Sequence, residues 1–125
     1  MAKFPEPKEG SVFYEDKKTY ACLAFHPIVE GHTILAWKED VEDINDLSEE
    51  DYLYLASIVY KVRRCLLGVY GTDKVYVAYL DEFRHVHFHL FPRNPGGEIG
   101  FGLMVKPHGE LTDLSKIPAL IRAVQ

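Results

Sequence analysis

The chain has 125 residues, of which 47% are hydrophobic and 26% charged, and its net charge at neutral pH is −5. A chain of this length and composition can bury the core of one globular domain, so we expect a single domain over residues 1–125. An acidic chain lacks the broad basic surface of a general nucleic-acid-binding protein, so we expect no nucleic-acid partner.

The N-terminal residues 1–10 are rich in lysine, glutamate and proline and contain no apolar run of signal-peptide length. We expect them to form a flexible segment. No later apolar run reaches membrane-spanning length, and Cys22 and Cys65 lack the spacing of a metal or redox motif. We therefore expect no membrane partner, two reduced, buried thiols and a cytoplasmic location.

The first part of the chain predicts antiparallel strands followed by a long helix. Residues 11–14, 20–25 and 33–37 are typical of strands, and the polar residues 15–18 predict a hairpin turn between the first two. Ser48, with Asp51 three residues later, has the pattern of a helix N-cap, and Gly68 or Gly71 can end that helix. The apolar residues at helical spacing are Tyr52, Leu55, Ala56, Val59, Val62 and Leu66.

The second part predicts two strands joined by a hairpin, because only residues 81–84 separate a strand over residues 74–80 from the next apolar alternation. A glycine-rich loop follows over residues 94–100. Residues 101–105 are a candidate for a further strand, and residues 115–124 predict a short amphipathic helix. The expected fold class is α+β, an antiparallel sheet of about five strands with one long helix and a short C-terminal helix packed on it.

The most informative stretch is the run from His85 to Leu90, which has histidine at every second position. Alternate side chains of a strand face opposite sides, so Val86, Phe88 and Leu90 can enter a core while the imidazoles share the other face. Residues on one face lie roughly 6 to 7 Å apart, close enough for imidazoles to surround one ligand. Packing does not require this pattern, because imidazole is costly to bury unpaired. We expect a phosphate or a metal ion as the ligand.

This His-x-His-x-His run, followed by two apolar residues, resembles the signature of the histidine triad (HIT) nucleotide hydrolases and transferases. A second match covers residues 27–38, where a proline-rich turn, the pair Gly31-His32 and an apolar strand follow one another. The resemblance spans residues 12–93 and implies a HIT-like fold. Pro92-Arg93 after the triad is more similar to the fragile histidine triad and dinucleoside polyphosphate hydrolase branch.

The resemblance implies a hydrolase that cleaves dinucleoside polyphosphates or nucleotide conjugates at the α-phosphate. His87 would be the nucleophile, held in one tautomer by a backbone carbonyl, and would form a nucleotidyl-histidine intermediate that water then hydrolyses. His85, His89 and His32 would complete the catalytic set. The resemblance also implies a homodimer and no required cofactor, with Mg²⁺ accompanying only a polyphosphate substrate.

Several positions depart from the family or lie outside its motifs. Arg84, Arg93 and Lys106 could supply local positive charge, and we predict Arg84 and Arg93 as substrate-binding residues. Asp81 and Glu82 stand where many members carry Gln or Ser, so these carboxylates point away from the phosphate, hold a divalent cation, or weaken the activity.

The Asp or Asn that holds the ribose in many relatives should fall within residues 24–26, which contain neither residue type. This departure leaves the preference for base and ribose open. His26 and His108 match no motif position, so we expect them to be ordinary structural residues.

Three other functions stay open from the residues alone. The first is an adenosine phosphoramidase of the same family. The second is a metal-dependent enzyme in which two triad histidines and one of His32, Asp81 or Glu82 bind zinc or iron. The third is a nucleotide-binding protein without catalytic activity.

Overall fold

The computed structural model of the protein describes residues 4–80, 83–94 and 96–125. Within these residues, five strands form one antiparallel sheet in the order β1-β2-β3-β5-β4. The strands are β1 (Val12–Glu15), β2 (Thr19–Leu23), β3 (Thr33–Trp37), β4 (Val75–Tyr79) and β5 (His87–Pro92). The helices are η1 (Ile44–Asp46), α1 (Glu49–Val69), α2 (Phe101–Met104) and α3 (Ile117–Ala123). The predicted fold class, α+β with a five-stranded antiparallel sheet, is confirmed.

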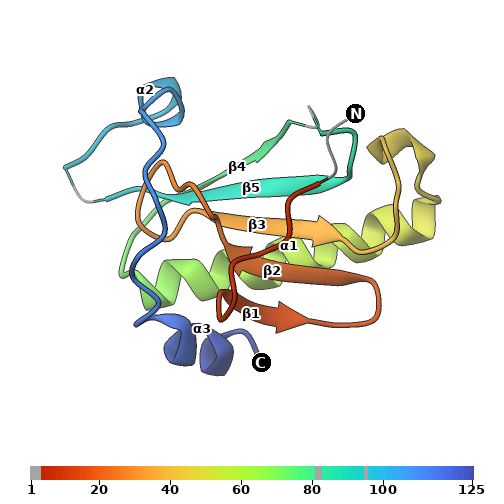
Figure 1. Cartoon of the computed structure of the whole chain (residues 1–125), viewed down its shortest axis with the longest axis horizontal. Helices are drawn as coiled ribbons and strands as arrows, with labels where there is room; N and C mark the ends of the chain where they lie inside the picture. The colour runs from red at the N-terminus through yellow and green to blue at the C-terminus, as the bar shows by residue number, and fades with distance from the viewer. Residues whose placement is uncertain (1–3, 81–82, 95) are drawn as a thin grey trace.

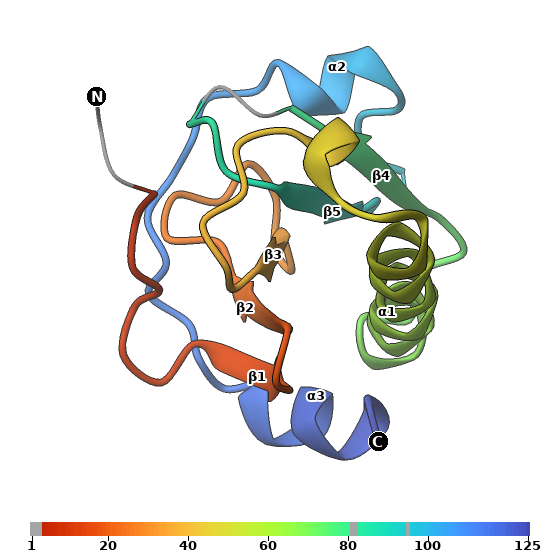
Figure 2. The same cartoon turned by 90° about the vertical axis from the view of Figure 1, so that its right-hand side faces the viewer.

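The two faces of the sheet are covered differently. Helix α1 lies along one face, and two extended segments cross the other (Figure 1). Figure 2 shows the same separation from the side, with α1 on one side of the strands and the extended segments on the other. We call residues 4–10 the N-terminal strap and residues 105–112 the crossing segment. The expected flexibility of residues 1–10 stays a prediction.

The long helix begins and ends where local signals place its ends. The Ser48 side chain accepts a hydrogen bond from the Asp51 backbone N–H at 3.1 Å, which confirms the predicted N-cap. The helix runs through Gly68 and ends before Gly71, which has a positive φ of 60°. Its buried residues are Leu55, Ile58, Val62, Cys65 and Leu66. They pack on a core that includes Leu35 and Leu90 of the sheet, whereas the predicted face residues Tyr52 and Ala56 are exposed.

The register of the sheet collects the histidines on the face opposite to α1. Ile34 of β3 pairs with Cys22 of β2 on one side and with His89 of β5 on the other. His87 lies two residues before His89 and therefore on the same face. The intervening apolar residues behave as the alternation predicts: Val86 and Leu90 are fully buried, and Phe88 packs against the core.

The candidate strand over residues 101–105 is wrong, because these residues form the short helix α2. The Val105 N–H donates to the Phe101 carbonyl and the Leu103 N–H to the Gly100 carbonyl, both within the segment. Leu103 is its one buried residue and packs with Phe91. A single buried residue anchors a helical turn, whereas a strand would need a partner strand for its backbone groups.

Burial makes both thiols poor nucleophiles. Cys22 and Cys65 are buried and free, as predicted, and burial raises the pKa of Cys22 to about 12 and that of Cys65 to about 11. None of the helices in the described part of the chain is long and apolar enough to cross a membrane.

Candidate active site

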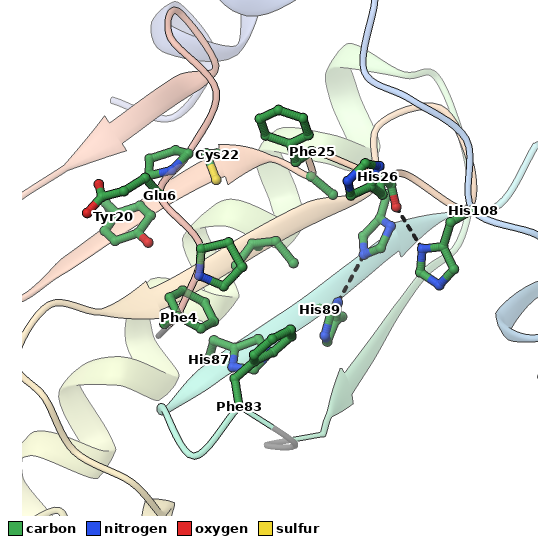
Figure 3. Close-up of a pocket in the computed structure, with 15 residues that line it drawn as sticks. Phe4, Glu6, Tyr20, Cys22, Phe25, His26, Phe83, His87, His89 and His108 are labelled. Carbon is green, nitrogen blue, oxygen red and sulfur yellow. Dashed lines mark hydrogen bonds between the residues drawn. The ribbon is translucent and has the colours of Figure 1, made fainter. Parts of the chain in front are cut away.

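The histidine-bearing face of the sheet forms the floor of a large cavity of about 630 Å³. The strands contribute Tyr20, Cys22 and Ile34 as well as His87 and His89, and the two crossing segments provide walls (Figure 3). A small cavity of about 300 Å³ adjoins it and is lined additionally by Ile28, Leu80, Phe91 and Met104. The residues common to both cavities are His32, Phe83, His87, His89 and His108. A ligand held at His87 can therefore extend into both cavities.

His87 is held in one tautomer by its own strand. Its Nδ1 lies 2.7 Å from the His85 carbonyl oxygen, and the side chain is 2% exposed. A carbonyl oxygen can only accept, so Nδ1 carries the proton and the lone pair of the neutral ring is on Nε2. This is the backbone-carbonyl contact that the resemblance implied for His87.

His32 and His89 form a hydrogen-bonded pair beside His87. The Ile28 backbone N–H donates to His32 Nδ1 at 3.1 Å, so the neutral His32 ring carries its proton on Nε2 and donates it to His89 Nδ1 at 3.0 Å. Burial, with a contribution from the neighbouring His89, lowers the pKa of His32 to about 3. Burial and the neighbouring His87 lower the pKa of His89 to about 4. Both rings are neutral at pH 7, and His89 is left with an N–H on Nε2.

His85 occupies a different environment from the other predicted site residues. Its Nε2 donates to the Trp37 carbonyl at 2.6 Å, and the Phe4 ring stacks on it with centroids 4.5 Å apart. Asp40 Oδ1 comes within 3.4 Å of the buried Nδ1 but without hydrogen-bond alignment. The structure thus brings His87, His89 and His32 together. It places His85 beneath the N-terminal strap, beside a second groove that shares Phe4, Glu6 and Tyr20 with the large cavity.

The predicted basic residues lie away from both cavities. Arg93 donates to Asp73 Oδ1 at 3.1 Å, and Arg84 is exposed in the turn before the triad with φ at 54°. Among the described residues, no lysine or arginine lines the large or the small cavity, and Lys106 is no exception. Asp81 and Glu82 lie outside the described residues. Substrate binding by Arg84 and Arg93 stays a prediction.

The sequence reading missed two histidines that line the large cavity, His26 and His108. The His108 Nδ1–H donates to the His26 carbonyl at 2.8 Å, and the Gly109 N–H donates to the Pro27 carbonyl at 2.7 Å. The crossing segment is thereby fixed along residues 25–27. No local pattern signals this contact, because more than 80 residues separate the paired segments along the chain.

The site residues predicted from the sequence include no metal ligands. In the described ranges, the structure contains no group of three or more His, Cys, Asp or Glu side chains that could hold a metal ion. The metal-dependent alternative used Asp81 or Glu82 as one option. These two residues lie outside the described residues.

Comparison with known families decides the assignment. The HIT domain model matches residues 6–96. The chain belongs to the HIT domain family. The predicted resemblance is confirmed, and the His85 to His89 run is its histidine triad.

Two curated relatives of this HIT domain are named as hydrolases of dinucleoside polyphosphates. A bis(5'-adenosyl)-triphosphatase of Saccharomyces cerevisiae is 29% identical over 99 residues, which cover 71% of this chain and 47% of the relative. The chain thus spans about half the length of that relative. An asymmetrical bis(5'-nucleosyl)-tetraphosphatase of Schizosaccharomyces pombe is 25% identical over 124 residues, covering 91% of this chain and 67% of the relative.

A solved structure agrees with the fold. A hypothetical histidine triad nucleotide-binding protein from Sulfolobus tokodaii superposes with a TM-score of 0.75 at 21% identity, covering 91% of this chain and 83% of the other. The order of strands and the long helix therefore belong to a HIT fold.

Proposed function

We propose that the protein hydrolyses dinucleoside polyphosphates or other nucleotide conjugates at the α-phosphate through a covalent nucleotidyl-His87 intermediate. The observation that carries this proposal is the hydrogen bond from His87 Nδ1 to the His85 carbonyl, on the floor of a cavity large enough for a nucleoside. The two hydrolase relatives support the substrate class.

The large cavity suits the nucleoside. Its walls carry the rings of Phe4, Tyr20 and Phe25, and aromatic side chains bind the flat face of a nucleobase. Residues 24–26 provide no carboxylate for the ribose. Glu6 of the N-terminal strap is the one acidic residue on the described wall, and we propose that its carboxylate accepts hydrogen bonds from the ribose hydroxyls.

The chemistry takes two steps. The lone pair of His87 Nε2 attacks the α-phosphorus, and the bond from phosphorus to the leaving atom breaks with its electron pair on that atom. The neutral His89 donates its Nε2–H to a phosphoryl oxygen and stabilises the charge there. Water then attacks the same phosphorus and releases a proton to the solvent, while the electron pair of the N–P bond returns to His87. Two in-line displacements leave the configuration at phosphorus unchanged.

The test compares wild type with His87→Asn, because the Asn amide can still donate to the His85 carbonyl but lacks the attacking nitrogen. Both proteins are incubated with diadenosine tri- and tetraphosphate and with adenosine 5'-phosphoramidate, with and without Mg²⁺, and the products are separated by chromatography. We expect AMP from wild type and a rate at least about a thousandfold lower from His87→Asn. Mass spectrometry of wild type denatured at alkaline pH, where the P–N bond of a nucleotidyl-histidine survives, should show an AMP adduct on His87.

The alternatives give different results in the same assay. Release of AMP only from the phosphoramidate would identify the phosphoramidase. Tight nucleotide binding with no turnover would favour a non-catalytic binding protein. Turnover that survives His87→Asn, together with stoichiometric zinc or iron in the purified protein, would replace the proposal with the metal-dependent enzyme.

A further inference from the structure

The proposed function fixes the direction in which the leaving group departs. Attacking and leaving atoms lie roughly in line at phosphorus. His87 belongs to β5, so an attack from the sheet directs the leaving atom away from the sheet. The segments on that side are the N-terminal strap and the crossing segment (Figure 1). A side chain on one of them is placed to give a proton to the leaving atom.

Two titratable side chains on these segments line the large cavity, Glu6 and His108. Of the two, only His108 also lines the small cavity, where His87 and His89 form part of the wall. In Figure 3 Glu6 lies near Tyr20 at one end of the large cavity, while His108 lies near His89 at the other end. His108 is therefore the proton-carrying side chain on the leaving side of His87.

Hydrogen bonds fix both the exposed side chain of His108 and the backbone that follows it. Its Nδ1 donates to the His26 carbonyl at 2.8 Å, as the dashed line in Figure 3 marks. The backbone on its C-terminal side is fixed by hydrogen bonds from the Gly109 N–H to the Pro27 carbonyl and from the Leu111 N–H to the Phe25 carbonyl. With Nδ1 bound to a carbonyl, Nε2 is the nitrogen through which His108 exchanges a proton.

The other histidine side chains in and near the large cavity have different hydrogen-bond partners or lie on the opposite side of the reacting phosphorus. His32 and His89 are hydrogen-bonded to each other and lie on the sheet side, with His87. His26 lines the large cavity but not the small one, and its Nδ1 lies 3.3 Å from the Gly109 carbonyl oxygen. His85 lines neither cavity and donates to the Trp37 carbonyl beneath Phe4. Within the described residues, no lysine or arginine lines either cavity. A protonated histidine would therefore also supply positive charge to an anionic ligand there.

We propose that His108 is the general acid that protonates the leaving group, an inference that rests on the proposed function. His108 enters as the imidazolium. As the N–P bond to His87 forms, the bond from phosphorus to the leaving atom breaks with its electron pair on that atom, and this pair takes the proton from His108 Nε2. His108 is then neutral, with Nδ1–H still bonded to the His26 carbonyl. The substrates that need this proton are those with a basic leaving atom, such as the amine of a nucleoside phosphoramidate.

The experiment uses two AMP derivatives that differ in the leaving group: an N-alkyl phosphoramidate, whose amine is basic, and the p-nitrophenyl ester, whose phenolate needs no proton. The variants are His108→Gln, which keeps an N–H near the position of Nε2, and His108→Asn, which keeps the contact to the His26 carbonyl. We expect both to reduce kcat/KM on the phosphoramidate by about 100-fold or more and to change the aryl ester only a few-fold. Lys106→Gln is the matched control, because Lys106 is exposed on the same segment and lines neither cavity.

Equal losses of activity on the two substrates would overturn the proposal in favour of a binding role. Phosphoramidate activity close to wild type in His108→Gln would also overturn it, because an amide donates a hydrogen bond but transfers no proton. Unchanged activity in both variants would overturn it as well. Melting temperatures equal to wild type confirm that the variants fold. Failure of the proposed function is distinguishable, because it would appear as activity that survives His87→Asn or as wild type without an AMP adduct.

Discussion

His32 Nε2 lies 3.0 Å from His89 Nδ1, and this hydrogen bond connects the start of β3 to β5 across the floor of the cavity. His32 is 2% exposed and is fixed in turn by the Ile28 backbone N–H. The pair is stable only while both rings are neutral, because a proton on either acceptor nitrogen would remove its hydrogen bond. The stability of the fold should therefore depend on pH in the range where histidine titrates.

We predict that the free energy of unfolding decreases as the pH falls below 6.5. In the folded state the pKa of His32 is lowered from 6.5 to about 3 and that of His89 to about 4. Between the lowered pKa of each ring and pH 6.5, the unfolded chain therefore binds more protons than the folded chain. The loss is of the order of 1 kcal/mol per pH unit for each ring. Urea unfolding at pH 7 and pH 5 measures it. His32→Gln should show a clearly smaller difference, and an equal difference in the two proteins would contradict the prediction.

Gly31, directly before His32, should tolerate no side chain. Its φ is +87°, and a Cβ atom there would lie 2.8 Å from Pro92 Cγ and 2.9 Å from Tyr70 Cζ. Backbone strain and overpacking together predict a loss of about 2–4 kcal/mol for Gly31→Ala. Gly68→Ala is the control, because Gly68 is in α1 and a Cβ atom added there would meet nothing within 4 Å, and it should gain about 0.5–1 kcal/mol. A Gly31→Ala protein as stable as wild type in urea would refute this.

Asp16 should hold the first hairpin to α1. Its carboxylate accepts hydrogen bonds from the hydroxyls of Tyr14 and Tyr54 and from the backbone N–H groups of Lys18 and Thr19. Partial burial acts to raise the pKa of Asp16, but these hydrogen bonds outweigh it and lower the pKa to about 2. We expect Asp16→Ala to cost about 2 kcal/mol at pH 7, measured by urea unfolding.

The contribution of Asp16 should be complete above its unfolded pKa near 4 and disappear as the pH falls through about 2. The exposed Asp46→Ala is the control and should change stability little. Equal stability of the Asp16 and Asp46 variants at pH 7 would show that the carboxylate does not hold the hairpin.

Local patterns carried much of the fold and part of the site. The alternation from His85 to Leu90 predicted the strand and its two faces, and Ser48 with Asp51 predicted the start of α1. Both signals lie within a few residues of the structure that they determine. The apolar run over residues 101–105 misled, because composition alone does not distinguish a short helix anchored by Leu103 from a strand.

The parts of the site that could not be predicted depend on contacts between distant segments. His108 reaches the cavity only because residues 109–111 bond to residues 25–27, and Phe4 covers His85 only because the N-terminal strap crosses the sheet. Arg93 follows the triad directly, yet its side chain bonds to Asp73 and lies away from the cavity walls. The position of Arg93 in the sequence therefore did not reveal its ion pair with Asp73.

The remaining prediction is a homodimer formed beside β4. This strand is the last in the sheet order, so one edge has backbone groups without a strand partner among the described residues. Arg63 Nε donates to the Val75 carbonyl, which holds α1 against the same strand. Val77 of this strand and Tyr52 and Tyr60 of α1 are 41%, 45% and 63% exposed. An apolar edge of this kind is suited to a second copy related by a twofold axis.

We expect light scattering at micromolar concentration to give the mass of a dimer for wild type and of a monomer for Val77→Lys, because a charge at the edge of β4 opposes pairing of two edges. Ile121→Lys is the matched control. Ile121 is similarly exposed, at 42%, but lies on α3, which packs on α1 and β1 at the opposite end of the sheet, so this variant should remain dimeric. If wild type is a monomer, the edge of β4 is not an interface between copies of this chain; if both lysine variants dissociate, the interface includes α3.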